Sequence, residues 1–193
     1  MKEIVAIVLA AGSSSRLGES KQLFLYKSKS LLRHSVEAAL QSKCSSVIVV
    51  LGANFDAHAA ELNDLDLDIV ENETWQNGMG NTLKAGLNYL LNNKFEFDGI
   101  LVMVCDQPMI SRSHLDKLIK EFSKRNNPIV ASQYSNSAGV PAIFNRTMLS
   151  QLLEIPDNKG AKHVIQSSSD AELVDFPGGE IDIDTIDDLK NLT

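Results

Sequence analysis

Hydrophobic positions in this chain come in short unbroken runs, separated by stretches in which apolar residues recur every three or four positions. Residues 4–9, 45–52 and 99–105 are centred on Val, Ile and Leu without polar alternation. Such runs are typical of strands that are buried on both faces of a parallel sheet. Residues 67–70 and 128–133 predict two further strands.

Helical spacing fills the intervals between these runs. Ser30, Asn81 and Ser111 are predicted to cap three helices, and residues 54–62 to form a shorter one. Strands that alternate with helices favour an α/β fold. The chain is therefore predicted to be a single domain, residues 1–193, with a mostly parallel, doubly wound (Rossmann-like) sheet and helices on both faces.

Composition and charge narrow the range of possible functions and partners. The 193 residues are 44% hydrophobic, enough for one domain with a full core. A net charge of −7 without a Lys/Arg cluster predicts no nucleic-acid partner. With neither a signal-peptide pattern nor an apolar run near the roughly 18 residues of a membrane span, the chain is expected to be cytoplasmic, with no membrane partner. Cys44 and Cys105 are expected to be reduced and structural.

The first apolar run ends in a loop of small residues that carries two cations. Leu9-Ala-Ala-Gly-Ser-Ser-Ser-Arg-Leu-Gly18 is followed closely by Lys21. Small residues let a ligand approach the backbone, and Arg16 and Lys21 suit phosphate oxygens. The standard phosphate loops do not fit, because five residues rather than four separate the two glycines and no glycine lies two or five positions after Gly12. Another kind of polyphosphate loop is predicted, with a plain small-residue turn as the alternative.

This loop resembles the signature L-A-(A/G)-G-x-S-x-R-(M/L/F)-G, with a Lys shortly after, of the MobA-like nucleotidyltransferases. Ala11, where the guanylyltransferase branch has Gly, makes the loop similar to the molybdenum cofactor cytidylyltransferase branch. The resemblance implies the fold of nucleotide-diphospho-sugar transferases. It also implies a set of nucleotide-binding residues: Leu9, Ala10, Ala11, Gly12, Ser13, Ser14, Arg16 and Lys21.

A second segment resembles the same branch. Residues 78–87 are similar to its G-M-G-x-S-L-x-x-G-L motif, with Thr in the place of Ser. The resemblance implies that four residues help to enclose the base and ribose: Gly78, Gly80, Asn81 and Thr82. The alternative is an ordinary glycine turn and helix cap. Trp75, just before this segment, is expected to pack rather than to stack on a base.

Asp106 follows the run over 99–105, at the edge of an α/β sheet where ligands bind. A carboxylate there is costly unless something pairs with it, and Mg²⁺ beside a triphosphate takes one or two carboxylates. Asp106-Gln107-Pro108 resembles the family's D-Q-P motif, whose aspartate holds the metal. A simple turn before Pro108 is the alternative. The resemblance thus implies Arg16, Lys21 and Asp106 as catalytic residues.

Two weaker resemblances concern the acceptor. Residues 137–144 are similar to the family's G-x-P-x-x-F segment, and residues 157–162 to G-D-x-G-A-R, with departures at its acidic and last positions. They imply acceptor contacts from five residues: Gln107, Pro108, Gly139, Pro141 and Gly160. A strand at the sheet edge that starts at the proline is an equal alternative for Pro141.

The tail over 181–189 alternates apolar and acidic residues, which predicts a short strand. It resembles the family's D-I-D-T-P-x-D-L ending. The resemblance implies Asp184, and more weakly Asp182, as a second metal carboxylate. An acidic stretch that complements a helix dipole is the alternative.

These residues and the resemblance together imply a Mg²⁺-dependent nucleotidyltransferase that transfers CMP from CTP to molybdopterin and releases pyrophosphate. A molybdoenzyme or its chaperone is a further candidate partner. The alternatives are another acceptor such as a sugar phosphate, GTP in place of CTP, and, in a different class, a non-catalytic protein that binds nucleotide or cofactor. His34, His58, His114 and His163 receive no role, and His114 is expected to face solvent.

Overall fold

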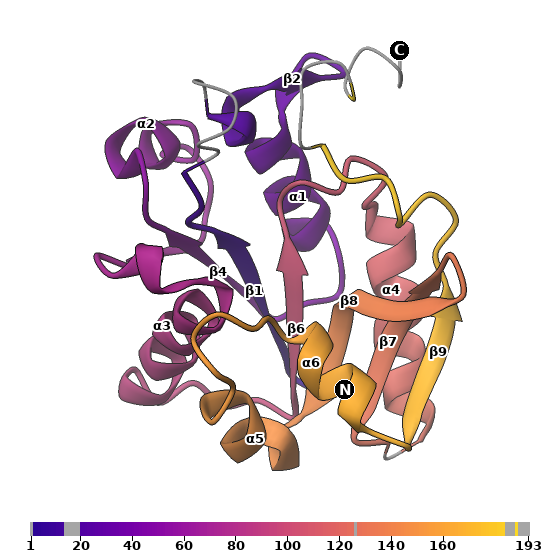
Figure 1. Cartoon of the computed structure of the whole chain (residues 1–193). Helices are drawn as coiled ribbons and strands as arrows, with labels where there is room; N and C mark the ends of the chain where they lie inside the picture. The colour runs from indigo at the N-terminus through magenta and orange to yellow at the C-terminus, as the bar shows by residue number, and fades with distance from the viewer. Residues whose placement is uncertain (1, 14–19, 126, 184–187, 189–193) are drawn as a thin grey trace.

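A computed structural model shows the chain as a seven-stranded sheet with helices on both faces (Figure 1). The structure describes residues 2–13, 20–125, 127–183 and 188. The strands of the sheet are β1 (Ile4–Ala10), β4 (Ser46–Leu51), β5 (Asp68–Glu71), β6 (Gly99–Val104), β7 (Ile129–Tyr134), β8 (Ser137–Asn145) and β9 (Ala171–Asp175). The α-helices are α1 (Leu31–Leu40), α2 (Phe55–Ala60), α3 (Met79–Asn92), α4 (Arg112–Lys124), α5 (Leu149–Leu153) and α6 (Lys162–Ser167). Shorter elements are the hairpin β2 (Leu25–Tyr26) and β3 (Lys29–Ser30), and the 3-10 turns η1 (Lys21–Leu23), η2 (Trp75–Asn77) and η3 (Arg146–Met148).

The sheet has the order β5-β4-β1-β6-β8-β7-β9, and β8 runs antiparallel to both of its neighbours whereas the other pairings are parallel. This confirms the predicted α/β fold with a mostly parallel sheet. The chain adds β4 and β5 on one side of β1 and then returns to place β6 on the other side. Ligands of open α/β sheets bind where the winding reverses in this way, at the carboxyl ends of the strands.

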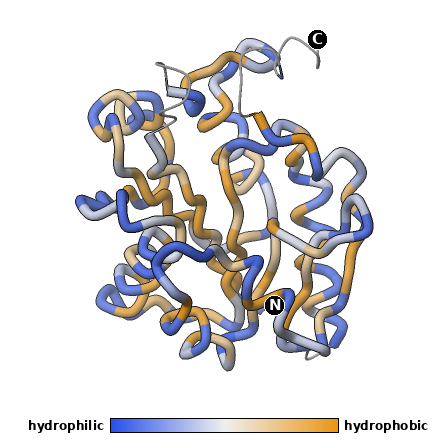
Figure 2. Tube along the Cα trace, viewed as in Figure 1, coloured by the Kyte–Doolittle hydropathy of each residue, from blue (hydrophilic) through white to orange (hydrophobic). Residues whose placement is uncertain are grey.

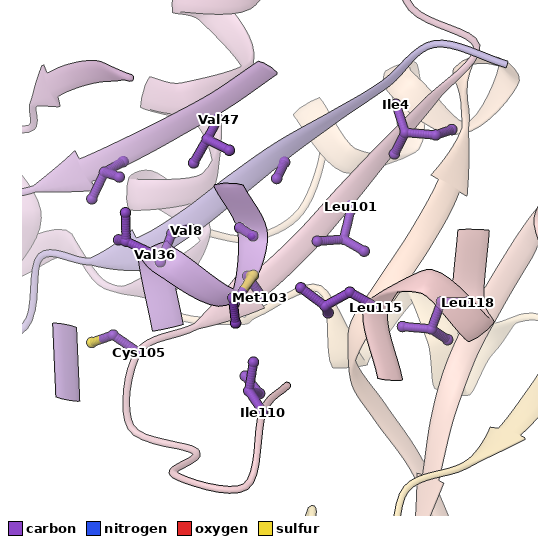
Figure 3. Packing of buried hydrophobic residues seen from close by; sticks show 14 of the residues in the cluster. Ile4, Val8, Val36, Val47, Leu101, Met103, Cys105, Ile110, Leu115 and Leu118 are labelled. Atoms are coloured by element: carbon purple, nitrogen blue, oxygen red, sulfur yellow. The ribbon is translucent and has the colours of Figure 1, made fainter. Parts of the chain in front are cut away.

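Alternate residues of β1 divide the core into two layers. Ile4 and Val8 pack in the layer covered by α1 and α4, whereas Val5 and Ile7 pack in the layer covered by α3, α5 and α6. Figure 3 shows Val8 in the first layer near Val36 of α1 and other apolar side chains. In Figure 2 the hydrophobic positions follow the central strands. Burial on both faces explains why the strands lack polar alternation.

Helix caps follow the prediction in two of three cases. The Ser30 hydroxyl accepts from the backbone N–H of Arg33 at 3.0 Å, and Ser111 caps α4 in the same way. The predicted start of α3 at Asn81 is wrong, because the helix begins at Met79. The Asn81 side chain cannot cap it, since its Oδ1 accepts from the amide of Asn72 at 2.9 Å.

One further expectation, for His114, and one alternative, for Pro141, are wrong. His114 does not face solvent; it is 5% exposed. Pro141 does not begin an edge strand, because β8 lies between β6 and β7. The missing N–H of Pro141 is tolerated there because the β7–β8 pairing shifts register at this point, from Ala131↔Ala142 to Ser132↔Gly139.

The tail returns to the carboxyl end of the sheet. Residues 181–183 do not form the predicted strand. Ile183 instead packs with Phe24, Tyr26 and Leu31, and its N–H donates to the carbonyl of Asp106 at 2.9 Å. In the described part of the chain, no helix has the length and apolar character needed to cross a membrane.

Candidate functional site

The carboxyl ends of β1 and β6 open into a cleft of about 330 Å³. The cleft brings together predicted site residues from separate parts of the chain: Leu9, Ala10, Ala11, Gly12, Ser13, Lys21, Gly78, Thr82 and Asp106. Three other predicted residues, Ser14, Arg16 and Asp184, lie outside the described residues. The two predicted nucleotide segments therefore face one space, next to the predicted metal carboxylate.

Lys21 and Asp106 form an ion pair in this cleft. Nζ of Lys21 lies 2.7 Å from Oδ2 of Asp106, and the two side chains keep 18% and 24% of their surface exposed. The sequence predicted that a carboxylate at the end of β6 needs a partner, and here this ammonium provides one. The pair places opposite charges side by side, so that the ammonium can bind an anion and the carboxylate a cation.

The backbone of the first loop is held by a buried amide that sequence analysis missed. Gln22 is 2% exposed, and its Nε2 donates to the carbonyl of Gly12 at 2.6 Å. No local pattern marks Gln22, because its partner lies ten residues earlier in the chain. A Cβ built on Gly12 would meet no atom of the described residues within 4 Å. Packing within the described part of the chain therefore does not require glycine here, and leaves this face of the loop open to a ligand.

The loop before α3 is held by Asn72, a second residue that the sequence did not identify. Asn72 is 4% exposed. Its Nδ2 donates to Oδ1 of Asn81 at 2.9 Å and to Oγ1 of Thr82 at 3.2 Å. These contacts fix the turn that carries Trp75. Trp75 packs closely on Gly52, where a Cβ would come within 2.7 Å of the Trp75 Cβ, and it also lines the cleft.

The same loop is locked to residues 156–160. The N–H of Gly80 donates to the carbonyl of Asp157 at 2.8 Å, and Gly78 has φ +119°, which favours glycine. Gly160, which the resemblance assigns to the acceptor, lies against Met79, because a Cβ there would be 2.6 Å from its sulfur. The nucleotide segment and the 156–160 segment therefore form one packed unit.

Gly80→Ala is expected to destabilise this unit. The added Cβ would lie 2.3 Å from the carbonyl oxygen of Pro156 and 2.6 Å from that of Lys159, so the backbone has to shift. We expect a loss of about 1–3 kcal/mol in the free energy of unfolding, measured by chemical denaturation. Gly12→Ala is the matched control, because its methyl group would touch none of the residues that the structure describes, and it should unfold like the wild type. Equal stability of both variants would contradict the close packing at Gly80.

The remaining residues assigned to the acceptor are buried. Gln107 is 2% exposed and donates to the carbonyl of Gly179 at 2.9 Å. A Cβ on Gly139 would lie 2.1 Å from the Tyr134 hydroxyl. Pro108 and Pro141 are buried as well. These four residues are not among those that line the cleft in the described part of the chain, and their contact with an acceptor stays a prediction.

His114 forms a buried polar contact with Ser132. Its ring stacks on Phe176 with a centroid distance of 4.1 Å, and its Nε2 lies 2.7 Å from Oγ of Ser132. The Ser132 hydroxyl donates to the carbonyl of Pro141 at 2.6 Å, so His114 donates to Ser132. Burial, and to a smaller extent the charge of Lys117, lowers the pKa of His114 to about 4.

Stability should therefore fall in mild acid. His114 stays neutral in the folded protein down to about pH 4, whereas in the unfolded chain it takes up a proton below about pH 6.5. The unfolded state binds more protons in this interval, so the free energy of unfolding falls by up to about 3 kcal/mol from pH 6.5 to pH 4. His114→Phe, which keeps the stacking and cannot titrate, should lose less stability over the same interval. Identical pH slopes for the two proteins would contradict this assignment.

The chemistry of the cleft does not include a thiolate. Cys105 lines the cleft, but burial raises the pKa of its thiol to about 12. Burial likewise raises the pKa of Cys44 to about 11. Both thiols are protonated at neutral pH, which agrees with the structural role expected for them.

A divalent cation fits Asp106, the carboxylate that lines the cleft among the described residues. Burial raises the pKa of the Tyr134 hydroxyl, a hydrogen bond with Gln107 lowers it, and the negative charges of Asp182 and Asp106 raise it. Among the residues described, no three His, Cys, Asp or Glu gather as a metal site by themselves. Mg²⁺ needs no such group, since one or two carboxylates and substrate phosphates suffice. The hydrogen bond from Ile183 to Asp106 holds this part of the tail beside the cleft.

Comparison with known proteins agrees with this geometry. Residues 6–172 match the family described as the MobA-like NTP transferase domain. Nicotine blue oxidoreductase of Paenarthrobacter nicotinovorans is 34% identical over 144 residues, 74% of this chain and 67% of the relative. Molybdenum cofactor cytidylyltransferase of Escherichia coli is 26% identical over 192 residues, 98% of this chain and 95% of the relative.

Solved structures share the fold over the whole chain. Rv0371c of Mycobacterium tuberculosis superposes with a TM-score of 0.84 at 27% identity and covers 99% of this chain and 97% of its own. Its manganese complex superposes with a TM-score of 0.80 at 25% identity, over 98% and 97% of the two chains.

Proposed function

We propose that this chain, which belongs to the MobA-like NTP transferase family, transfers CMP from CTP to a molybdopterin-type acceptor and releases pyrophosphate. The Lys21–Asp106 pair in the cleft at the ends of β1 and β6 is the observation that carries this proposal. It offers a cation for phosphate beside a carboxylate for a metal ion. The relative named molybdenum cofactor cytidylyltransferase, matched over 98% of this chain, supports the choice of acceptor.

The reaction needs no protein nucleophile. An oxygen of the acceptor phosphate attacks the α-phosphorus of the NTP, the bond from that phosphorus to the bridging oxygen breaks, and pyrophosphate leaves in line. Lys21, together with Arg16, neutralises charge on the phosphates, and the open face of Gly12 lets them approach the backbone. Asp106 and Asp184, with Asp182 as a weaker third, would hold Mg²⁺, which supplies further charge neutralisation when bound.

Ala11 supports a pyrimidine nucleotide. Ala11 lines the cleft and is 4% exposed, and its carbonyl accepts from the N–H of Ala53 at 3.0 Å, which helps to hold its backbone in place. The methyl group would crowd a purine. A mismatch of about 1–3 kcal/mol would give CTP roughly 10- to 200-fold higher kcat/KM than GTP.

A screen of nucleotides tests the proposal. Pyrophosphate release is measured for each of the four NTPs with Mg²⁺ or Mn²⁺, with and without molybdopterin, and a sugar phosphate replaces molybdopterin in a parallel arm. Release that needs CTP and molybdopterin together supports the proposal. Release with a sugar phosphate alone moves the acceptor to that class, and nucleotide binding without release identifies a non-catalytic binding protein.

An oxidoreductase on the same fold is a second candidate, because nicotine blue oxidoreductase is 34% identical to this chain over 144 residues. The pattern of glycines argues against a Rossmann dinucleotide site in the first loop. Oxidation of reduced nicotinamide cofactors with a quinone-like dye as acceptor, in the absence of NTP, would favour this candidate.

A further inference from the structure

His58 on α2 is a buried polar residue that the proposed mechanism does not use. Its side chain is 0% exposed, and its Nδ1 has no hydrogen-bond partner among the described residues. Its Nε2 lies 2.6 Å from Oγ of Ser20, the residue directly before Lys21. The ring comes from α2 and contacts the residue next to Lys21. His58 is therefore a candidate for a role in the cleft.

The hydrogen bonds around His58 show which of its ring nitrogens carries the proton. Nε2 of Gln22 donates to the carbonyl of Gly12, so Oε1 of Gln22 accepts from the Ser20 hydroxyl at 2.7 Å. This bond uses the single proton of the hydroxyl, and Nε2 of His58 therefore donates to the Ser20 oxygen. The ring is the neutral tautomer with a bare Nδ1. Burial lowers the pKa of His58, which favours the same neutral form.

We propose that His58 is a positioning residue, which holds η1 and the ammonium of Lys21 in place through Ser20 and Gln22. The relay ties α2 to the end of β1, because Gln22 bonds to Gly12, and it fixes the chain on both sides of residues 14–19. A cleft ordered in advance spares the nucleotide part of the entropy cost of binding. This inference rests on the proposed function, since it concerns how Lys21 meets a nucleoside triphosphate.

The test compares two substitutions of the ring. His58→Phe keeps most of the volume and removes the donor, whereas His58→Gln keeps a donor that can reach the Ser20 oxygen. We measure the Kd for CTP by calorimetry, kcat and KM for CTP, and Tm. His58→Phe should raise Kd and KM about 10-fold, the effect of one lost buried hydrogen bond, and leave kcat within about threefold. His58→Gln should restore most of the affinity.

Ser20→Ala and the double variant with His58→Phe complete a cycle. Because both side chains share the His58–Ser20 bond, the double variant should lose less affinity for CTP than the sum of the two single losses, although Ser20→Ala also removes the donor to Gln22. Ser20→Ala leaves the buried N–H of His58 unpaired, so it should melt at a lower temperature than the double variant. Asn145→Ala removes the side-chain cap of η3, at the opposite end of β6 from Asp106, and should lower Tm without changing Kd.

Several outcomes separate the two proposals. Wild-type affinity in His58→Phe with a lowered Tm would overturn the inference and make His58 merely structural. Additive losses of affinity in the double variant would overturn it too. If His58→Phe does not fold, Ser20→Ala is compared with Asn145→Ala, and equal affinities would again overturn the inference. Absence of NTP binding in the wild type would overturn the proposed function, and the inference with it.

Discussion

Lys21→Met is expected to lower kcat/KM for NTP turnover by about 10²–10³ with the fold intact, which is typical for the loss of one electrostatic donor. Met keeps the stem of the side chain and removes the charge. Since Nζ of Lys21 lies 2.7 Å from Asp106, the variant also loses the group that orients this carboxylate. Steady-state pyrophosphate release and Tm measure the two effects separately.

The control for Lys21 is the same substitution in another ion pair. Lys124 at the end of α4 pairs with Glu121 at 2.6 Å and is 52% exposed, so Lys124→Met should turn over like the wild type. Arg16→Lys should lose activity as well, because an ammonium cannot replace a planar guanidinium with several donors. Near-normal turnover in Lys21→Met would show that this ammonium does not act on the triphosphate.

Asp106→Asn and Asp184→Asn are each expected to lose activity by about 10² or more and to keep Tm within a few degrees. Asn removes a hard anionic oxygen from Mg²⁺, which binds through few carboxylates and cannot easily replace one. Asp182→Asn should lose less, because Asp182 matches a weaker position of the family ending. The measurement is pyrophosphate release against Mg²⁺ concentration, together with Tm in the absence of metal.

Asp116→Asn is the matched control for the carboxylates. Asp116 accepts from the N–H of Lys43 at 2.9 Å, near the start of β4 and away from the cleft, so its loss should affect Tm alone. If Asp184→Asn were as active as the wild type at ordinary Mg²⁺, Asp184 would have the capping role instead, since Asn caps helices as well as Asp.

The sequence predicts the sheet and the cleft because their signals are local. An apolar run without alternation is enough to identify β1, β4 and β6 as buried strands, and the residues at their carboxyl ends then share one edge. Lys21 and Asp106 could be placed in one site for this reason, although 85 residues separate them.

Other parts of the site depend on contacts that no local pattern carries. Asn72 and Gln22 look like ordinary polar residues in the sequence, and only the folded chain shows that they hold the two loops. His114 was expected at the surface, because its burial comes from stacking on Phe176 of a distant segment. Gly160 matches a family motif, but which residue it packs against depends on how residues 156–160 meet the loop before α3.

The position of β1 also affects how the chain folds as it is synthesised. Val8 pairs with Val49 on one side and with Met103 on the other, so β1 is synthesised well before its second partner strand, β6. Until β6 arrives, one edge of β1 has unpaired backbone groups between apolar side chains, which is the kind of surface that aggregates. Parallel pairing over such sequence distances also forms slowly. Nascent chains that end before Val104 are therefore expected to depend on chaperones. Fragments that end before β6 are expected to be insoluble.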